Sequence, residues 1–292
     1  MDFWLWLPLG LIAALGTAAA DAVTKRFFTD LSPYGMALAY WLFALPYLLL
    51  VGLAITWPPL DRTFWLAVLL ALPLEAAAAL LYMRAIKVCP LSLCIPFLAF
   101  TPLFLIVTGQ LILGEGLNGW GVAAVFLIAG GSYVLSLSTG RFGFLAPIRA
   151  LLREAGARCM LAVAVLYSCT AALGKLAILH SEPAFYGVLY PLIFSVVMLA
   201  GYPLSNPRPA RALLARRRWG LLLGLCMAAV ILSQVYGLKM APAAYLIAVK
   251  RTSVFFSVVL GGVWLKERPI APRLVGAALM ALGVLLIAFK GS

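Results

Sequence analysis

Long apolar stretches separated by short polar connections run through the whole chain. A helix needs about 20 apolar residues to cross the hydrocarbon core of a bilayer. Breaks at proline, at glycine and at clusters of charged residues divide this sequence into ten stretches of about that length. We therefore predict an all-α membrane protein with ten transmembrane helices. The predicted helices cover residues 3–24, 34–57, 63–84, 91–113, 118–137, 159–180, 184–203, 219–238, 242–265 and 271–289.

The composition excludes an ordinary soluble protein. Of the 292 residues, 65% are apolar and 11% are charged, and the mean hydropathy is +1.09. A typical soluble domain has about 25% charged residues. The net charge of +13 does not indicate a nucleic-acid partner, because such proteins gather their cations on a soluble face and ten spans leave no soluble domain. The lipid bilayer is the expected surrounding.

The cations are unevenly divided between the two sets of connections. Sixteen of the 22 Lys and Arg residues lie in or beside the connections 1–2, 3–4, 5–6, 7–8 and 9–10, and the opposite side has only Arg62, Lys239 and Lys290. The positive-inside rule places the sixteen in the cytoplasm and both termini outside, in a multi-pass protein of the cell (inner) membrane. Residues 141–158 alternate arginine with leucine and isoleucine, which is typical of an amphipathic helix on the anionic inner leaflet.

The two halves of the sequence align without a gap at an offset of 152 residues. Lys87 falls on Lys239, Pro90 on Pro242 and Glu115 on Glu267. Each half has five spans, and because five is odd the second copy enters the membrane inverted, as in transporters that bind substrate where the halves meet. We predict two inverted five-helix repeats around a central cavity. The predicted units are the first repeat at 1–140, a basic amphipathic connector at 141–158 and the second repeat at 159–292.

Both repeats have a Gly-rich fifth helix that follows an acidic turn, Leu113-Gly114-Glu115 in the first and Leu265-Lys266-Glu267 in the second. With these features the chain resembles EamA-type members of the drug/metabolite transporter superfamily. The resemblance implies ten helices around a central cavity, with the fourth and ninth helices among its walls, and transport by alternating access. Family members usually keep both termini in the cytoplasm, whereas the charge distribution of this chain predicts the reverse.

Three cations lie inside the predicted spans: Lys175, Lys250 and Arg251. A charge near the centre of a membrane helix costs about 2.5–3.5 kcal/mol, so it normally faces a cavity or a partner. Snorkelling is a simple explanation for Lys175, which lies close to a helix end. It is a poor one for Lys250 and Arg251, which lie roughly 12 Å inside the ninth span at 1.5 Å per residue.

The ninth span carries further candidate substrate contacts. Helical spacing puts Lys250, Ser253 and Ser257 on one face, with Arg251 about 100° around the helix. Tyr245, about one turn before Lys250, is a candidate contact for a substrate hydroxyl, although a Tyr near a helix end is more often interfacial. A guanidinium fork beside a mobile ammonium group suits phosphate or carboxylate. This Lys-Arg pair resembles the phosphate-gripping pair of the plastid triose-phosphate/phosphate translocators, and Lys175 is a third candidate cation.

Two carboxylates complicate an anion site. Glu75 lies in the middle of the third span, and Asp21 lies late in the first. One interpretation is that they neutralise the buried cations, since an unpaired buried ion is costly. The other is that Glu75 takes up and releases a proton during transport, or that substrate displaces it from Lys250 or Arg251. Three cations against one or two carboxylates favour an anionic or zwitterionic substrate.

The leading functional hypothesis is a secondary transporter of a small organic anion, phosphorylated or not, that binds at Lys250 and Arg251. The alternatives are a proton-coupled exporter of amino acids or amphipathic drugs that uses Glu75, and a lipid-phosphate flippase. We expect no enzyme, no catalytic residue, no cofactor and no metal, because the single histidine, His180, has no partner cluster and the five cysteines indicate neither a metal site nor a disulfide framework. A monomer and a homodimer are both compatible with the sequence.

Overall fold

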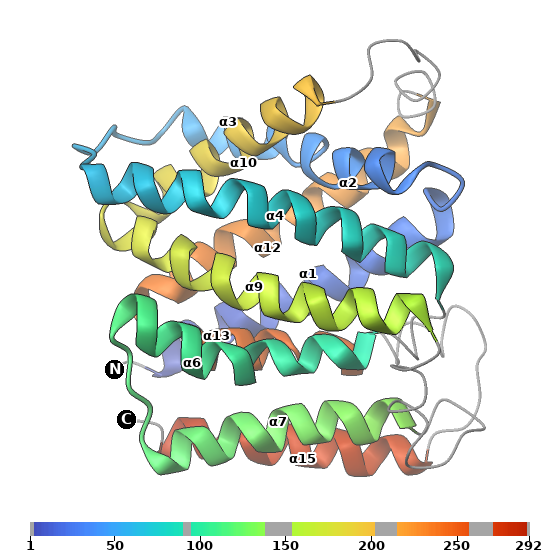
Figure 1. Cartoon of the computed structure of the whole chain (residues 1–292), viewed down its shortest axis with the longest axis vertical. Coiled ribbons are helices and arrows are strands. Elements are labelled where there is room, and N and C mark those ends of the chain that lie inside the picture. Colours follow the sequence, from blue (N-terminus) through green and yellow to red (C-terminus); the bar gives the residue numbers. More distant parts are fainter. Residues whose placement is uncertain (1–2, 90–94, 138–153, 202–214, 257–270, 291–292) are drawn as a thin grey trace.

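The computed structural model describes residues 3–89, 95–137, 154–201, 215–256 and 271–290 (Figure 1). In these ranges the chain forms helices and turns and no strand. Within the described residues, six helical segments are long and apolar enough to cross a membrane, and three shorter apolar helices accompany them. The predicted all-α membrane fold is confirmed. Its elements are α1 (Phe3–Phe27), α2 (Pro33–Leu42), α3 (Leu45–Gly52), α4 (Arg62–Val88), the 3₁₀ helix η1 (Ile95–Phe100), α6 (Thr101–Leu113), α7 (Gly119–Leu137), α9 (Ala155–Leu179), α10 (Pro183–Ala200), α12 (Arg217–Met240), α13 (Ala243–Lys250) and α15 (Ala271–Lys290).

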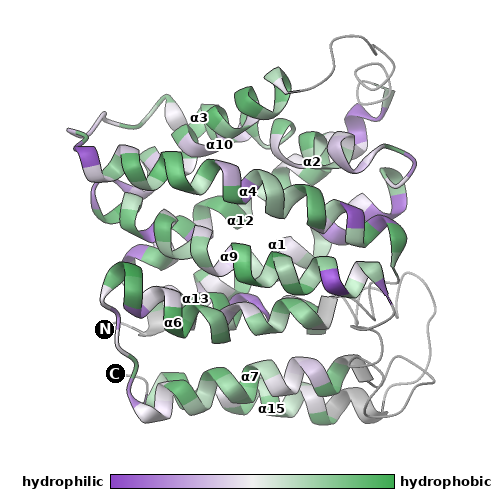
Figure 2. Ribbon diagram, in the orientation of Figure 1, coloured by the Kyte–Doolittle hydropathy of each residue, from purple (hydrophilic) through white to green (hydrophobic). Residues whose placement is uncertain are grey.

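Local signals in the sequence set several helix ends. The Ser32 hydroxyl accepts a hydrogen bond from the Gly35 N–H at 3.1 Å, and the Asp61 carboxylate accepts one from the Phe64 N–H at 2.8 Å, so both side chains cap a helix start. Gly114 has a φ of 68° and ends α6. Apolar residues cover the middle of the helices, and hydrophilic residues gather mainly at their ends (Figure 2). Each helix is therefore delimited as expected for a membrane span.

The two repeats are inverted and interlocked. Both termini lie at one side of the molecule, where α1 begins, and α9 begins at the opposite side (Figure 1). At the offset of 152 residues, α1 corresponds to α9 and α4 to α12, and η1 corresponds to residues 247–252 at the end of α13. The contacts follow this correspondence, because α1 packs on α12 as α9 packs on α4, and α1 contacts α13 as α9 contacts η1. The predicted pair of inverted repeats is confirmed.

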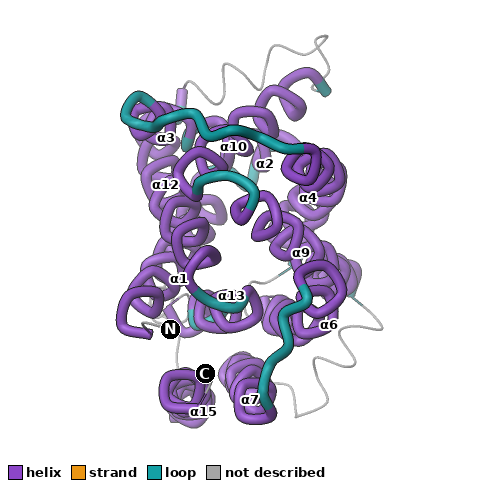
Figure 3. The backbone as a smooth tube through the Cα atoms, turned by 90° about the vertical axis from the view of Figure 1, so that its left-hand side faces the viewer, coloured by secondary structure: helices purple, strands orange, loops and turns teal. Residues whose placement is uncertain are grey.

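The fifth helices of the repeats, α7 and α15, pack closely against each other at one edge of the molecule (Figure 3). A Cβ atom at Gly131 would lie 2.7 Å from the Gly276 carbonyl oxygen, and one at Gly283 would lie 2.9 Å from the Ala124 carbonyl oxygen. Gly131 and Gly283 are equivalent positions of the two repeats, as are Ala124 and Gly276. Small residues at these points let the two backbones approach, as is common between membrane helices.

The predicted spans and connector differ from the structure at several points. The second span is not one helix but α2 and α3, because Pro46 has no N–H to donate to the carbonyl of Leu42. At this break, a Cβ atom on Gly224 would lie 1.8 Å from the Phe43 carbonyl oxygen. Because glycine has no side chain, the backbone of α12 can lie directly against the backbone of the break. The ninth span is also interrupted, as described below. Helix α9 begins at Ala155, so the last residues of the predicted connector belong to this helix, and residues 141–153 lie outside the described part.

The expectation of no disulfide is wrong for one cysteine. Cys89 is disulfide-bonded, and its partner lies outside the described residues. Cys89 follows the last residue of α4, where the chain turns toward the next helix. A cysteine in such a turn can meet a second one without disturbing a helix, whereas Cys159, Cys169 and Cys226, which lie within helices, are free.

Candidate functional site

A cavity of about 150 Å³ lies where the two repeats meet. The helices α1, α4, α9, α10, α12 and α13 surround the centre of the molecule, while α7 and α15 lie apart from it (Figure 3). Both repeats supply lining residues, so neither repeat forms the cavity alone. An engineered cavity of this volume takes up benzene, so the size fits a small molecule. The polar and aromatic lining consists of Thr17, Tyr40, Trp41, Glu75, Tyr82, Thr101, Tyr167, Thr170, Tyr186, Tyr190, Gln234, Lys250 and Arg251.

The helix that carries the two cations is interrupted at the cavity. Helix α13 ends at Lys250, and the backbone continues with short i→i−3 bonds from Thr252 to Val249 and from Phe255 to Thr252, each 2.9 Å long. At the offset of 152 residues, the turn at 251–252 corresponds to 99–100, the last residues of the 3₁₀ helix η1. The fourth helix of each repeat therefore departs from α-helical geometry near the same position. Interrupted helices of this kind border substrate sites in transporters built from inverted repeats.

Lys250 and Arg251 both line the cavity, and each has a neutral partner. The Lys250 ammonium donates to the Gln234 side-chain oxygen at 2.5 Å, and the Arg251 guanidinium donates to the Thr101 hydroxyl at 3.0 Å. Among the described residues, no carboxylate lies within 4.0 Å of either cation. The Arg251 side chain is 6% exposed, and its Nε has no hydrogen-bond partner in the described part of the chain. The two charges thus remain available to an anion.

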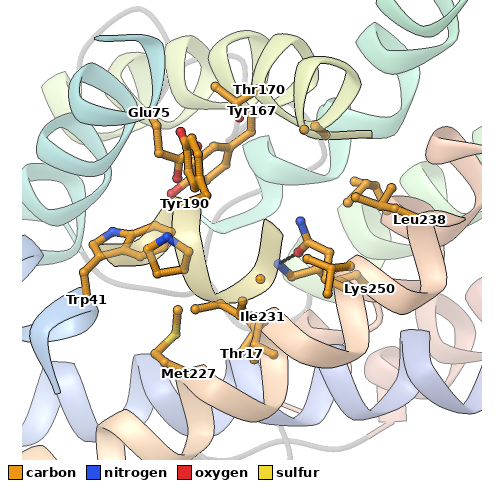
Figure 4. A pocket seen from close by; sticks show the side chains of 18 of the residues that line it. Thr17, Trp41, Glu75, Tyr167, Thr170, Tyr190, Met227, Ile231, Leu238 and Lys250 are labelled. Atoms are coloured by element: carbon orange, nitrogen blue, oxygen red, sulfur yellow. Dashed lines mark hydrogen bonds between the residues drawn. The ribbon is translucent and has the colours of Figure 1, made fainter. Parts of the chain in front are cut away.

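Glu75 lies on the opposite wall of the cavity from Lys250 (Figure 4). Its carboxyl group is within hydrogen-bonding reach of the Thr170 hydroxyl and interacts electrostatically with Lys250. Asp21 does not line the cavity. It is 3% exposed and accepts a 2.7 Å hydrogen bond from the Tyr82 hydroxyl, which does line it. Glu75 thus faces Lys250 across the cavity, and among the described residues neither Glu75 nor Asp21 forms an ion pair with Lys250 or Arg251.

Lys175 is buried at a different place, outside the cavity lining. Its ammonium forms an ion pair with one oxygen of Glu115 and donates to the Ala241 carbonyl oxygen at 2.5 Å. The other Glu115 oxygen accepts a 2.9 Å hydrogen bond from the N–H of Ala243, the first residue of α13. Lys175 and Glu115 therefore join α9 to the start of α13, and Lys175 does not add to the charge of the cavity.

Two further residues that the sequence predicted to contact substrate, Tyr245 and Ser253, do not line the cavity. Tyr245 is 2% exposed, and its hydroxyl end packs against the backbone of Gly121 on α7, away from the cavity lining. Ser253 is buried and also absent from the lining. The interruption after Lys250 places Ser253 beyond the regular helix, so the predicted stripe of Lys250 and Ser253 on one helical face does not form. Ser257 lies outside the described residues.

Sequence reasoning missed the aromatic wall of the cavity and the hydroxyl of Thr101. Tyr167, Thr170 and Gly174 line the cavity from α9, and Tyr186 and Tyr190 line it from α10. Their spacings of three, four and seven residues mark one face of a helix. This signal was available in the sequence, but a tyrosine or threonine in an apolar span is also common away from a site.

The cavity extends further toward the side of the termini. Leu238, which lines it, is two residues from the end of α12, whereas Met227 lies ten residues after the start of that helix. Toward the cation-rich side, the Lys25 ammonium donates to the Ile86 carbonyl oxygen at 2.6 Å and ties α1 to α4. The Tyr82 hydroxyl bond to Asp21 joins the same two helices. These two bonds join α1 to α4 near the cation-rich end of the bundle.

A further polar pair lies outside the spans. The Asp61 carboxylate, which caps α4, also lies 2.7 Å from Nδ1 of His180. The hydrogen bond from the Phe64 N–H, together with the bond to His180, holds the pKa of the Asp61 carboxyl group below its usual range. Asp61 and His180 are both exposed, as expected for a histidine at the membrane surface.

Comparisons with known proteins agree with this architecture. The profile of the EamA-like transporter family matches residues 4–137 and 155–289, once for each repeat. A solved structure described only as "Crystal structure of protein" has a TM-score of 0.71 and 16% identity, over 98% of this chain and 97% of that chain, which supports the fold. Curated protein sequences give no match. Because the family profile matches both repeats and nearly the whole chain, this protein belongs to the EamA-like transporter family, a family of multi-pass membrane transporters.

Proposed function

We propose that this protein is a secondary transporter that carries a small organic molecule with a carboxylate or phosphate group. The observation that carries the proposal is the pair of cations, Lys250 and Arg251, at the interrupted ninth helix with only neutral partners. A desolvated charge without an opposite charge is costly, and an anionic group of the substrate would supply one. The Arg251 Nε, which has no partner among the described residues, is a donor for the same group.

The structure and the inverted repeats support alternating access as the mechanism. The bonds of Lys25 and Tyr82 join α1 to α4 on the cation-rich side, and the cavity extends toward the termini. With the termini outside, as the positive-inside count predicts, this arrangement is the outward-facing state. Exchange of the two repeat conformations would open the cation-rich side, and the interruptions at η1 and after α13 are the points where the fourth and ninth helices would bend.

The decisive experiment is counterflow in liposomes. The purified protein is reconstituted and screened with small organic anions and zwitterions, and the hits are repeated with a Lys250→Gln, Arg251→Gln double variant. We expect the double variant to lose uptake at least tenfold, because charge-assisted hydrogen bonds contribute about 1.5–3 kcal/mol each. Lys239→Gln is the matched control, since Lys239 pairs with Glu182 at 3.0 Å at an exposed position. Equal uptake by wild type and double variant would reject the assigned site.

A second candidate is proton-coupled export of amino acids or amphipathic drugs through Glu75. It is favoured by the position of Glu75 in the cavity wall, among Tyr167, Thr170 and Tyr190 (Figure 4). Abolished proton-driven efflux in Glu75→Gln, with transport retained in the Lys250 and Arg251 variants, would favour it. A lipid-phosphate flippase receives less support, because a cavity of about 150 Å³ suits a small molecule better than a lipid headgroup with its chains.

A further inference from the structure

The cavity has two poles of opposite charge. Lys250 and Arg251 lie on the side of α13, and Glu75 lies on the wall formed by α4, opposite Lys250 (Figure 4). The charges interact across the cavity but form no ion pair within 4.0 Å. With Lys175 paired to Glu115 outside the cavity, the charged lining consists of two cations, Lys250 and Arg251, and one carboxylate, Glu75. A ligand with a single negative charge would match only one of these poles.

The Glu75 pole is built from acceptors and aromatic rings. Tyr167, Tyr186 and Tyr190 are close enough to Glu75 to interact with it electrostatically. The Tyr190 side chain is 7% exposed, lines the cavity, and its hydroxyl has no hydrogen-bond partner among the described residues. A buried polar atom of this kind normally has a partner. Trp41, which faces the same part of the cavity (Figure 4), adds an aromatic ring.

We propose that the substrate is a small zwitterion, held with its anionic group at Lys250 and Arg251 and its ammonium group at Glu75 and Tyr190. This assignment rests on the proposed function and extends it to the second pole. The carboxylate of Glu75 neutralises the ammonium charge, and the Tyr190 hydroxyl accepts one of its N–H groups. The aromatic faces of Trp41 and Tyr167 attract the cation further. The ammonium group must carry at least one N–H, because Glu75 and Tyr190 bind it by accepting hydrogen bonds.

The test compares ligands that differ only at the ammonium group. Binding to the purified protein is measured by isothermal calorimetry with three pairs of probes: alanine and lactate, leucine and 2-hydroxy-4-methylpentanoate, and phenylalanine and phenyllactate. Each pair keeps the carboxylate and replaces the ammonium with a hydroxyl. We expect the wild type to bind at least one 2-amino acid about tenfold or more tightly than its partner. If no pair shows this preference, the assignment is wrong.

The protein variants separate the two poles. In Glu75→Gln the preference for the 2-amino acid falls to about one, while affinity for the 2-hydroxy acid is kept. In Lys250→Gln both ligands of a pair weaken by the same factor and the preference remains. A Glu75→Gln variant that weakens both ligands equally would overturn the ammonium site and leave the proposed function intact. A Lys250→Gln variant that binds both ligands as the wild type does would contradict the proposed anion site instead.

A milder variant covers the case in which Glu75→Gln does not fold. Tyr190→Phe removes only a hydroxyl that has no partner in the described structure, so it should not reduce stability. We expect it to lower the preference for the 2-amino acid severalfold without changing affinity for the 2-hydroxy acid. Glu182→Gln, at the exposed pair with Lys239, is the matched control and should leave the preference unchanged. An unchanged preference in Tyr190→Phe would remove this hydroxyl from the site.

Discussion

Lys175 and Lys250 are both lysines within apolar helices, yet their surroundings are opposite. Lys175 has a carboxylate and a carbonyl oxygen as partners, from Glu115 and Ala241. Lys250 has the side-chain amide of Gln234 and lines the cavity. A buried charge that is fully neutralised stabilises a contact between helices, whereas one that keeps its charge at a cavity is available to a ligand. The sequence presents both as lysines in a membrane span, and only their partners separate the two roles.

The largest effect should follow from removing the carboxylate of the neutralised pair. In Glu115→Ala, Lys175 stays buried without an opposite charge, and the N–H of Ala243 at the start of α13 loses its acceptor. Breaking a buried pair costs about 3–5 kcal/mol, and we expect about 3 kcal/mol because Glu115 is 21% exposed. The free energy of unfolding in detergent, from a denaturant titration, measures the loss.

A double variant is the control for this prediction. Lys175→Met with Glu115→Gln removes both charges and keeps an oxygen for the Ala243 N–H. It should recover most of the lost stability, since replacing both members of a buried pair is often neutral. If Glu115→Ala were as stable as the wild type, the pair would not join α9 to α13 as described.

The second prediction concerns the cation in the cavity. Lys250→Gln should change the free energy of unfolding by less than about 1 kcal/mol, because no ion pair is broken among the described residues. Its effect should fall on binding, with affinity for carboxylate ligands reduced about tenfold or more. Denaturant titration and calorimetry on the same preparation measure both quantities. A loss of stability as large as that of Glu115→Ala would show that Lys250, like Lys175, stabilises the fold.

A smaller effect should follow from removing the neutral partner of Arg251. In Thr101→Val the hydroxyl that accepts from the guanidinium is lost, and the side chain keeps nearly the same shape. We expect a loss of about 1 kcal/mol in the free energy of unfolding. Thr101→Ser, which restores the acceptor, should recover it. Equal stability of the valine and serine variants would mean that this bond contributes nothing.

The smallest effect should come from a pair at the surface. The lowered pKa of Asp61 means that its ionised form stabilises the fold above the ordinary pKa of 3.8, and that this contribution is lost as the pH falls through the lower value of the folded state. Asp61→Asn retains a helix-capping oxygen and removes the charge, so it should lower the Tm slightly at pH 7 and not below about pH 3. Asp61→Ala, which also removes the cap, should lower the Tm more. Thermal unfolding across pH measures both, and an asparagine effect that does not depend on pH would contradict the prediction.

Much of the fold follows from the sequence. The apolar spans predicted the described helices to within a few residues, apart from the interruptions at Pro46, at η1 and after Lys250. The matches of Lys87 with Lys239 and of Pro90 with Pro242 predicted the inverted repeat, which the contacts of α1 with α12 and of α4 with α9 confirm. These features depend on hydrophobicity and on local backbone chemistry, both of which are encoded along the chain.

The candidate site was predictable only in part. Lys250, Arg251 and Glu75 stand out because charge is expensive in a membrane span, and all three line the cavity. By the same criterion Lys175 was included, although it is paired outside the cavity. Tyr190 and Thr101 were missed because hydroxyl side chains in membrane helices are common and carry no comparable cost.

The sequence by itself determined that the chain is an all-α membrane protein, that its halves are inverted copies, and which charges lie within apolar helices. The tertiary structure decided what each buried charge meets. Arg251 and Thr101 are 150 residues apart in the sequence and become neighbours only when the two repeats interlock. In a span that is apolar on every side, the pattern of residues does not reveal which face turns inward, so the partners of a charge are set by helix packing alone.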